Sequence, residues 1–189
     1  FEPPAAIIAT NVAGERVARS IVSATRRLER RVRFVTSVAS QCGVKNSYDR
    51  PSQLGADRWA ALIGARHLHR GPCVVVNAGT TMTVDALAAD GVFLGGMIVA
   101  GTDLMRGALA RKTAQLRPRG GKFAYFPART ADAIESGTVN ALAGAIERML
   151  RFMCEAGQET PLAMLSGGAA QFIAPHLNGT VDVVDNLVL

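Results

Sequence analysis

The chain is poor in cysteine and has no long apolar run. Its three cysteines form no Cys-x-x-Cys pair and cannot all pair with one another, which indicates a reducing, cytoplasmic compartment. No uncharged apolar run reaches the roughly 18 residues of a membrane-spanning helix, so we expect no membrane partner. The start, Phe-Glu-Pro-Pro, has no signal-peptide pattern and no initiator methionine, so we expect the chain to begin within a longer sequence.

The composition is that of a globular protein. Apolar residues make up 49% and charged residues 19% of the 189 residues, enough for one domain or two small ones. The net charge of +6 favours an anionic partner. Arginines are concentrated in segment 16–33, but no aromatic side chains interleave with them to stack on bases. We therefore interpret this segment as a solvated helix face and do not expect a nucleic-acid partner.

Hydrophobic periodicity predicts a mixed α/β protein. Apolar runs and period-2 alternation predict short strands, and a period near 3.6 predicts helices. The strand at residues 5–9 is expected to be buried. The expected strands are residues 5–9, 32–34, 73–77, 81–86, 92–99, 162–165 and 181–184; the expected helices are 17–28, 57–69, 102–111, 130–153 and one ending near 177. The strands between 73 and 99 form an antiparallel meander, and residues 41–55 are expected to be a loop.

Glycine and hydroxyl residues follow the apolar strand at 73–77. Gly79 lets a phosphate approach the backbone, while backbone N–H groups and the hydroxyls of Thr80 and Thr81 can donate to its oxygens. The segment is not a Walker A loop, because no Gly-Lys-Ser/Thr follows. An ordinary β-turn before a strand explains the same residues equally well.

Asp57 stands at the start of the predicted helix 57–69, after Gly55 and Ala56. One interpretation is a helix N-cap, which accepts hydrogen bonds from backbone N–H groups. The other is a base: the helix dipole and Arg58 would keep the carboxylate ionised, so that it could accept a proton from a substrate alcohol. The residues alone leave both interpretations open.

Two glycine pairs are the remaining candidate segments. Gly95 and Gly96 interrupt a predicted strand, where a plain β-bulge or a close contact with a ligand would explain them. Gly167 and Gly168 lie between a predicted strand and a helix. Small residues there would let a flat ring lie against the backbone, or the turn simply needs one glycine.

Together and in this order, the segments resemble the type III pantothenate kinases of the acetate-kinase/Hsp70/actin superfamily. The matching motifs are Thr10–Gly14, Asn46–Tyr48, Leu54–Trp59, Asn77–Thr81, Gly95-Gly96-x-Ile98, Thr130-x-x-Ala133-Ile134-x-x-Gly137, Ser166–Ala169 and Asn186–Leu189. The resemblance implies an actin-like (RNase H-like) α/β fold with two domains around a nucleotide cleft. The domains would be residues 1–70, with the pantothenate-binding loop and helix, and residues 71–189.

The resemblance also implies an activity: transfer of the γ-phosphate of ATP to the primary hydroxyl of pantothenate, the first step of coenzyme A biosynthesis. Asp57 would be the general base. The implied pantothenate-binding residues are Tyr48, Gly55, Ala56, Asp57, Arg58 and Thr130; the implied ATP-binding residues are Gly79, Thr80, Thr81, Gly95, Gly96, Gly167 and Gly168. Mg²⁺, a monovalent cation (K⁺ or NH₄⁺) at position 77 and a homodimer are implied as well.

The sequence departs from the family pattern in two places. Asn77 replaces the Asp that holds the monovalent cation in the family; it keeps a carbonyl oxygen but loses a full charge. The family's opening strand, with an Asp-x-Gly-Asn-Thr/Ser-like phosphate motif, has no counterpart before residue 5, and we expect it to lie outside the given sequence. These departures motivate an alternative function, a non-catalytic regulator that binds a nucleotide or metabolite on the same fold.

Overall fold

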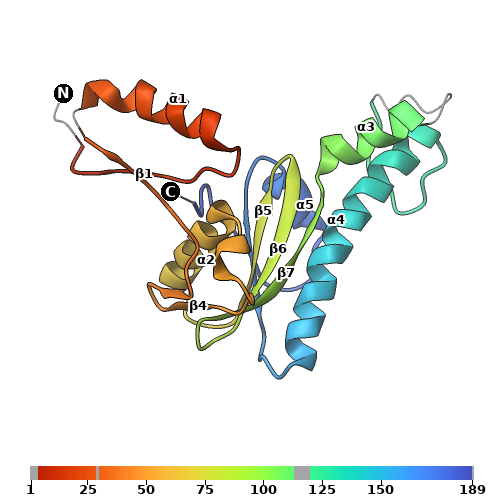
Figure 1. The fold of residues 1–189 in the computed structure, drawn as a ribbon. Helices are drawn as coiled ribbons and strands as arrows, with labels where there is room; N and C mark the ends of the chain where they lie inside the picture. The colour runs from red at the N-terminus through yellow and green to blue at the C-terminus, as the bar shows by residue number, and fades with distance from the viewer. Residues whose placement is uncertain (1–3, 29, 113–119, 189) are drawn as a thin grey trace.

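A seven-stranded mixed sheet forms the centre of the computed structural model, which describes residues 4–28, 30–112 and 120–188. The strands run in the order β3-β4-β7-β6-β5-β8-β9. Helix α2 (Ala56–Leu68) packs on one face of this sheet and helix α4 (Thr130–Glu155) on the other (Figure 1). The strands are β3 (Ser40–Gln41), β4 (Val44–Asn46), β5 (Cys73–Ala78), β6 (Thr81–Leu87), β7 (Val92–Ala100), β8 (Leu162–Ser166) and β9 (Val181–Val183).

Strands β5, β6 and β7 form the expected antiparallel meander, with Asn77 opposite Thr83 and Asp85 opposite Gly96. Strands β8 and β9 extend the sheet in parallel from β5. Strand β5 is apolar at consecutive positions because both of its faces are covered, which is typical of a central strand.

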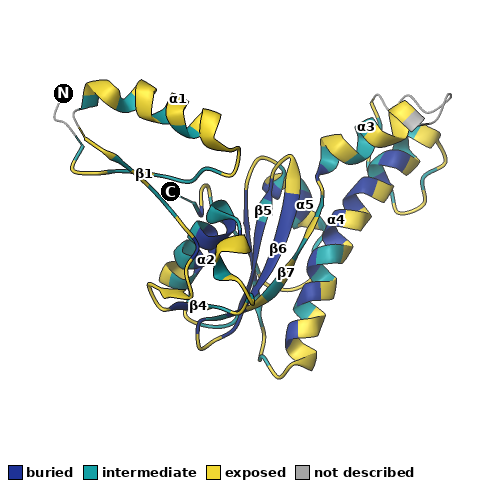
Figure 2. Cartoon of the chain, in the orientation of Figure 1, coloured by how far each residue is buried: buried dark blue, intermediate teal, exposed yellow. Residues whose placement is uncertain are grey.

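Each face of the sheet has its own hydrophobic core (Figure 2). Even-numbered residues of β5 and β6 pack against α4, whereas odd-numbered residues of β5 point toward α2, because successive side chains of a strand point to opposite faces. The α4 side includes Val74, Val76, Val84, Leu142, Ile146 and Met153; the α2 side includes Trp59, Leu62, Val75, Leu87 and Phe93. Polar residues 81, 83 and 85 of β6 therefore lie on the α2 face.

An arm of the N-terminal residues projects beside this body (Figure 1). It consists of β1 (Ile7–Ala9), α1 (Glu15–Thr25), the 3-10 turn η1 (Arg26–Leu28) and β2 (Val32–Phe34), with β1 and β2 paired in parallel. The strand predicted at 5–9 is present, but the expectation that it is buried is wrong: Ile8 is 61% exposed. No residue of α1 is fully buried either: Ala18, Ile21 and Thr25 are half-buried, and the helix contacts β2.

The loop expected at 41–55 is only partly a loop. Strands β3 and β4 form a short antiparallel pair around Cys42 and Gly43, and β4 continues the main sheet by pairing with β7. The 3-10 turn η2 (Pro51–Gln53) follows. The remaining elements are α3 (Thr102–Lys112), α5 (Ala170–Ile173) and the 3-10 turn η3 (Ala174–His176).

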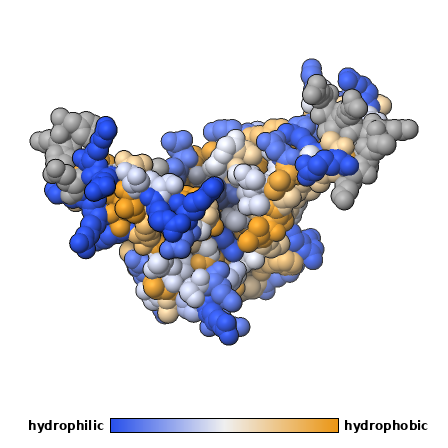
Figure 3. Space-filling view, turned by 45° about the horizontal axis from the view of Figure 1, so that its top comes forward, coloured by the Kyte–Doolittle hydropathy of each residue, from blue (hydrophilic) through white to orange (hydrophobic). Residues whose placement is uncertain are grey.

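The surface in Figure 3 mixes hydrophilic and hydrophobic residues and is indented between the two projecting parts of the molecule. Among the described helices, none combines the length and apolar character that crossing a membrane requires. The division into two domains at residue 70 stays a prediction.

Candidate functional site

A buried ion pair joins the first turn of α2 to the middle of β6. Arg58 is 6% exposed and Asp85 is 1% exposed. The Arg58 Nε donates to both carboxylate oxygens of Asp85, at 3.2 and 3.1 Å, and Nη2 donates to Oδ1. A guanidinium that meets a carboxylate through two of its nitrogens is fixed in orientation as well as in position.

Aromatic rings enclose the same guanidinium. The Arg58 Nη1 donates to the Tyr48 hydroxyl at 3.2 Å. The Arg58 Cζ lies 5.9 Å from the centre of the Tyr48 ring and 5.8 Å from that of Phe93, distances typical of cation–π contacts. Arg58 is thus held by Asp85, Tyr48 and Phe93, which come from three different segments of the chain.

Asp57 lies on the second residue of α2, half-buried, next to this pair. Its Oδ1 accepts a hydrogen bond from the backbone N–H of Arg58 at 2.8 Å. The N-cap of the helix is Gly55, so the N-cap interpretation of Asp57 is wrong. A Cβ on Gly55 would lie 2.6 Å from Asp57 Oδ1, so glycine here leaves room for the carboxylate. The helix N-terminus favours the ionised form of such a group.

Burial sets the protonation behaviour of the pair. Desolvation raises the pKa of Asp85; the hydrogen bonds and charge of Arg58 oppose that rise, and the nearby charge of Asp57 adds to it. Desolvation works to lower the pKa of Arg58, but the hydrogen bond and charge of Asp85 outweigh it and hold that pKa above its ordinary value. The guanidinium therefore stays charged.

Gly96 on β7 leaves the space that the ion pair occupies. A Cβ at this position would overlap Asp85 Oδ1 and would lie 2.6 Å from Arg58 Nη2. The structure thus places Gly96 beside Arg58 and Asp85, while its predicted part in ATP binding stays a prediction. Gly95 has a φ of +136° and nothing near its Cβ position, so its backbone conformation, not crowding, favours glycine.

The predicted phosphate residues meet at the other end of the same strands. A cavity of about 380 Å³ is lined by Ala78, Gly79, Thr80, Thr102, Asp103, Leu104, Gly168 and Ala169. Thr81 opens β6, and its carbonyl accepts from Gly79 N–H at 3.1 Å. The β5–β6 turn and the β8–α5 turn therefore face one cavity, although Thr80 and Gly168 are 88 positions apart in the sequence.

Asn77 lies at the end of β5, beside Gly167. Gly167 has a φ of +95°, and a Cβ there would lie 2.9 Å from Asn77 Oδ1 and 2.7 Å from the Ala78 carbonyl oxygen. Across the sheet, Asn77 pairs with Thr83 on one side and Ser166 on the other. Cross-strand partners share a face of a sheet, so three neutral oxygen-bearing side chains stand in one row.

Thr130 lies apart from the other predicted pantothenate residues. It is exposed at the start of α4 and lines an apolar cavity of about 570 Å³ between α3 and α4, with Met105, Ala108, Leu109, Ala133, Ile134, Gly137 and Thr138. Its role in pantothenate binding stays a prediction.

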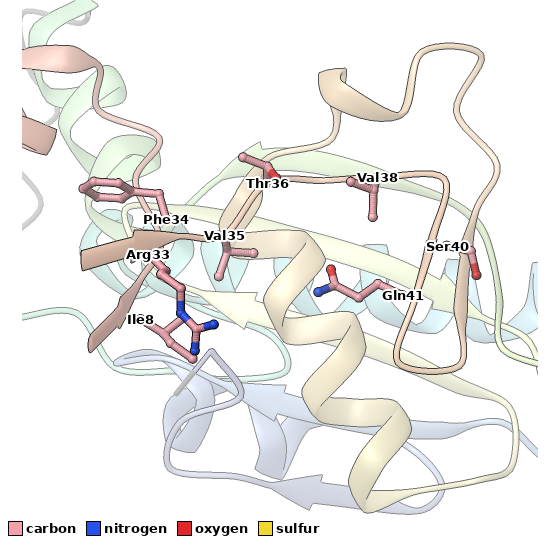
Figure 4. Close-up of a pocket in the computed structure, with 8 residues that line it drawn as sticks. All are labelled: Ile8, Arg33, Phe34, Val35, Thr36, Val38, Ser40 and Gln41. Carbon is pink, nitrogen blue, oxygen red and sulfur yellow. The ribbon is translucent and has the colours of Figure 1, made fainter. Parts of the chain in front are cut away.

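A larger cavity, of about 590 Å³, lies between the arm and the β3 region and contains none of the predicted site residues (Figure 4). Ile8, Arg33 and Val35 line it on the arm side, and Gln41 lines it near α2. The Gln41 Oε1 accepts a hydrogen bond from Trp59 Nε1 at 3.1 Å. Among the described residues no group of three or more His, Cys, Asp or Glu side chains could hold a metal ion.

Asp85 is the site residue that the sequence analysis missed. The available signal was the alternation of Thr81, Thr83 and Asp85 with apolar residues, which marks a strand with one polar face. Such a face is normally solvated. Here β6 lies between β5 and β7 and under α2, so Thr83 and Asp85 are buried, at 8% and 1% exposure.

Comparison with known proteins agrees with this arrangement. A family model for type III pantothenate kinase matches residues 1–151. A type III pantothenate kinase of Nitrosospira multiformis is 48% identical over 186 residues, covering 98% of this chain and 71% of that protein. Another, of Aromatoleum aromaticum, is 52% identical over 183 residues, covering 97% of this chain and 75% of that protein.

The fold can be compared with that of a solved structure. The crystal structure of a Baf family protein from Campylobacter jejuni, described as a transcriptional activator, superimposes with a TM-score of 0.62 at 18% identity; the match covers 97% of this chain and 77% of that one. With the central mixed sheet between helices, it confirms the actin-like α/β fold. The family match and the two relatives go further than the fold: this chain belongs to the type III pantothenate kinase family.

Proposed function

We propose that this protein transfers the γ-phosphate of ATP to the primary hydroxyl of pantothenate and so forms 4′-phosphopantothenate, the first step of coenzyme A biosynthesis. The observation that carries the proposal is the identity of 48% to 52% with named type III pantothenate kinases along nearly the whole chain. No finding favours the alternative of a non-catalytic regulator.

Asp57 is the proposed general base. Its half-buried carboxylate accepts one backbone hydrogen bond, which leaves its other oxygen available to a substrate hydroxyl. A base within hydrogen-bond reach of the hydroxyl removes its proton as the oxygen attacks phosphorus. Gly55, Ala56, Arg58 and Tyr48 surround this carboxylate and form the proposed pantothenate site, to which Thr130 would be added from α4.

ATP is proposed to bind at the other end of the sheet. The backbone N–H groups and hydroxyls of Gly79, Thr80 and Thr81 would hold phosphate oxygens, and Gly167 and Gly168 would let the nucleotide lie against the backbone. Thr81 and Asp85 are four residues apart on β6, which is about 13 Å along a strand. The phosphate turn and the pantothenate site are thus fixed on one rigid element, and the bound substrates must together span this distance to bring the hydroxyl to the γ-phosphate.

The proposal includes two cations. Mg²⁺ usually binds through one or two carboxylates together with substrate phosphates, which fits a site without a cluster of acidic ligands among the described residues. When bound, it neutralises phosphate charge. The oxygen of Asn77, in one row with Thr83 and Ser166, fits a monovalent cation such as K⁺, for which neutral oxygens are suitable ligands. A cytoplasmic location and a homodimer complete the proposal.

The test is ADP release by the purified full-length protein with ATP and Mg²⁺, measured with and without pantothenate and in buffers of K⁺, NH₄⁺ or neither. We expect ADP release that requires pantothenate and increases with K⁺ or NH₄⁺. Tight binding of pantothenate or ATP in a calorimeter without turnover would favour the regulator instead. Light scattering on the same sample measures whether the protein is a dimer.

A further inference from the structure

We propose that Asp85 is a positioning residue for pantothenate: it holds the Arg58 guanidinium so that its remaining N–H groups point at the bound substrate. The inference rests on the proposed function, because it concerns the same site. Asp85 acts through Arg58 and is not proposed to touch the substrate.

The count of hydrogen-bond donors supports this role. A guanidinium has five N–H groups. Arg58 uses Nε and one N–H of Nη2 for Asp85, and one N–H of Nη1 for Tyr48. One N–H on Nη1 and one on Nη2 have no hydrogen-bond partner in the part of the chain that the structure describes. Two adjacent free N–H groups form the fork that binds carboxylate or carbonyl oxygens.

The surroundings of Arg58 prevent other orientations. The Asp85 carboxylate is fixed on a central strand, and the backbone of Gly96 closes against both side chains. The rings of Tyr48 and Phe93 lie beside the guanidinium. Gly96 itself is exposed, so the pair lies directly beneath the surface at this point, where a small substrate can reach it.

Charge gives Asp85 a second effect on binding. Without its carboxylate, the buried guanidinium would keep an uncompensated charge and would turn toward Asp57, the nearest remaining carboxylate on the first turn of α2. The proposed base would then be paired with Arg58 instead of with the substrate hydroxyl. Asp85 therefore keeps Arg58 and Asp57 in separate roles.

A purely structural ion pair makes a different prediction. Loss of a pair that serves only stability lowers the melting temperature but leaves the Michaelis constants of the folded enzyme unchanged. A positioning pair changes the constant for the substrate that it positions. The ratio of the effects on pantothenate and on ATP therefore separates the two roles.

The experiment compares full-length wild type with Asp85→Asn and Gly96→Ala. Asp85→Asn removes the charge and keeps the shape. Gly96→Ala keeps both charges and displaces the carboxylate, so it reports on the geometry even where Asp85→Asn fails to fold. We expect both variants to raise KM for pantothenate about tenfold or more, the effect of losing a charged hydrogen bond. In Asp85→Asn, KM for ATP should rise less than about twofold.

Two controls match these changes. Asp182→Asn alters an exposed carboxylate on β9 of the same sheet, and Gly144→Ala adds a methyl group on α4 where nothing lies within 4 Å. Neither should change either KM. Circular dichroism melts of all variants identify the temperature range in which each is folded. The KM values for pantothenate and ATP are compared within that range.

Calorimetric titration with pantothenate distinguishes failure of the inference about Asp85 from failure of the proposed function. If wild type binds pantothenate but has no turnover, the proposed function fails, and weaker binding by Asp85→Asn still supports the role of Asp85. An unchanged KM and binding constant for pantothenate in folded Asp85→Asn or folded Gly96→Ala overturns the role of Asp85, as does an equal rise of the pantothenate and ATP KM values in Asp85→Asn. Absence of pantothenate binding by wild type overturns both.

Discussion

The backbone of Gly96 lies directly against the carboxylate of Asp85, so close that a methyl group at residue 96 would overlap Oδ1. The two residues are opposite one another on β7 and β6. This contact gives a physical reason for a glycine inside a strand, where glycine is normally unfavourable. It also connects Gly96 to Arg58 and hence to the proposed pantothenate site.

Replacing Asp57 with Asn should remove turnover and leave the fold intact. The amide cannot accept the proton of the substrate hydroxyl, and general base catalysis typically contributes about 10² to 10⁴ in rate. The measurement is kcat with saturating pantothenate and ATP, with a circular dichroism spectrum for the fold. Asp182→Asn, at an exposed position on β9, is the matched control. Full activity of Asp57→Asn would show that Asp57 is not the base.

Replacing Thr80 with Ala should weaken the binding of ATP more than the binding of pantothenate. Thr80 lines the cavity at the β5–β6 turn, and its hydroxyl is a proposed donor to a phosphate oxygen. A hydrogen bond to a charged group is worth about 1.5 to 3 kcal/mol, so KM for ATP should rise roughly 10- to 100-fold. Thr180→Ala, at an exposed residue before β9, serves as the control. An unchanged KM for ATP would remove Thr80 from the phosphate site.

Replacing Asn77 with Asp should strengthen the binding of a monovalent cation. The carboxylate adds a full negative charge next to Gly167, and a unit charge pair at 4 Å is worth about 4 kcal/mol at an effective dielectric constant of 20, before desolvation. We expect the K⁺ concentration for half-maximal activity to fall about tenfold. A titration with KCl at constant ionic strength measures it. Identical K⁺ curves for both proteins would show that residue 77 does not bind the cation.

Cys73 should make the fold less stable in alkali. Burial raises the pKa of its thiol to about 12, against an ordinary value of 9.0, while Arg66 acts slightly in the other direction. Between these values the unfolded chain loses a proton that the folded chain keeps, so stability is unaffected below pH 9 and falls as the pH rises above it. From pH 8 to pH 10 the loss should be about 1.4 kcal/mol.

Urea unfolding of wild type and Cys73→Ala at both pH values isolates this effect. The variant loses stability from its cavity at every pH, but it should lack the part of the pH slope that belongs to the thiol. Parallel pH slopes for the two proteins would mean that Cys73 ionises equally in both states.

The sequence was sufficient to predict most of the regular elements, because their signals are local. The apolar run of β5, the alternation of β6 and the long periodic segment of α4 each predict their own structure, and all three are confirmed. Strands β3 and β4 were missed because they are short and contain turn residues. Strand β4 is a strand by virtue of its pairing with β7, which a local pattern does not reveal.

The candidate site could be predicted only where its residues carry a motif. Asp57 and Arg58 stand in a recognisable segment, but their partner Asp85 lies 27 residues further along in an ordinary alternating strand. Only the order of the strands and the packing of α2 bury that polar face and make the carboxylate a partner of Arg58. Thr130 lines the cavity between α3 and α4, away from Asp57 and Arg58, and its part in pantothenate binding stays a prediction.

The most direct measurement of the central claim is the chemical identity of the product. Purified full-length protein is incubated with pantothenate, ATP and Mg²⁺, with and without K⁺ or NH₄⁺, and the mixture is analysed by mass spectrometry and phosphorus NMR. We predict 4′-phosphopantothenate, with the phosphoryl group on the primary hydroxyl, and ADP in equal amount. ATP that stays intact, or that is hydrolysed to free phosphate without any phosphopantothenate under every cation condition, would contradict the account.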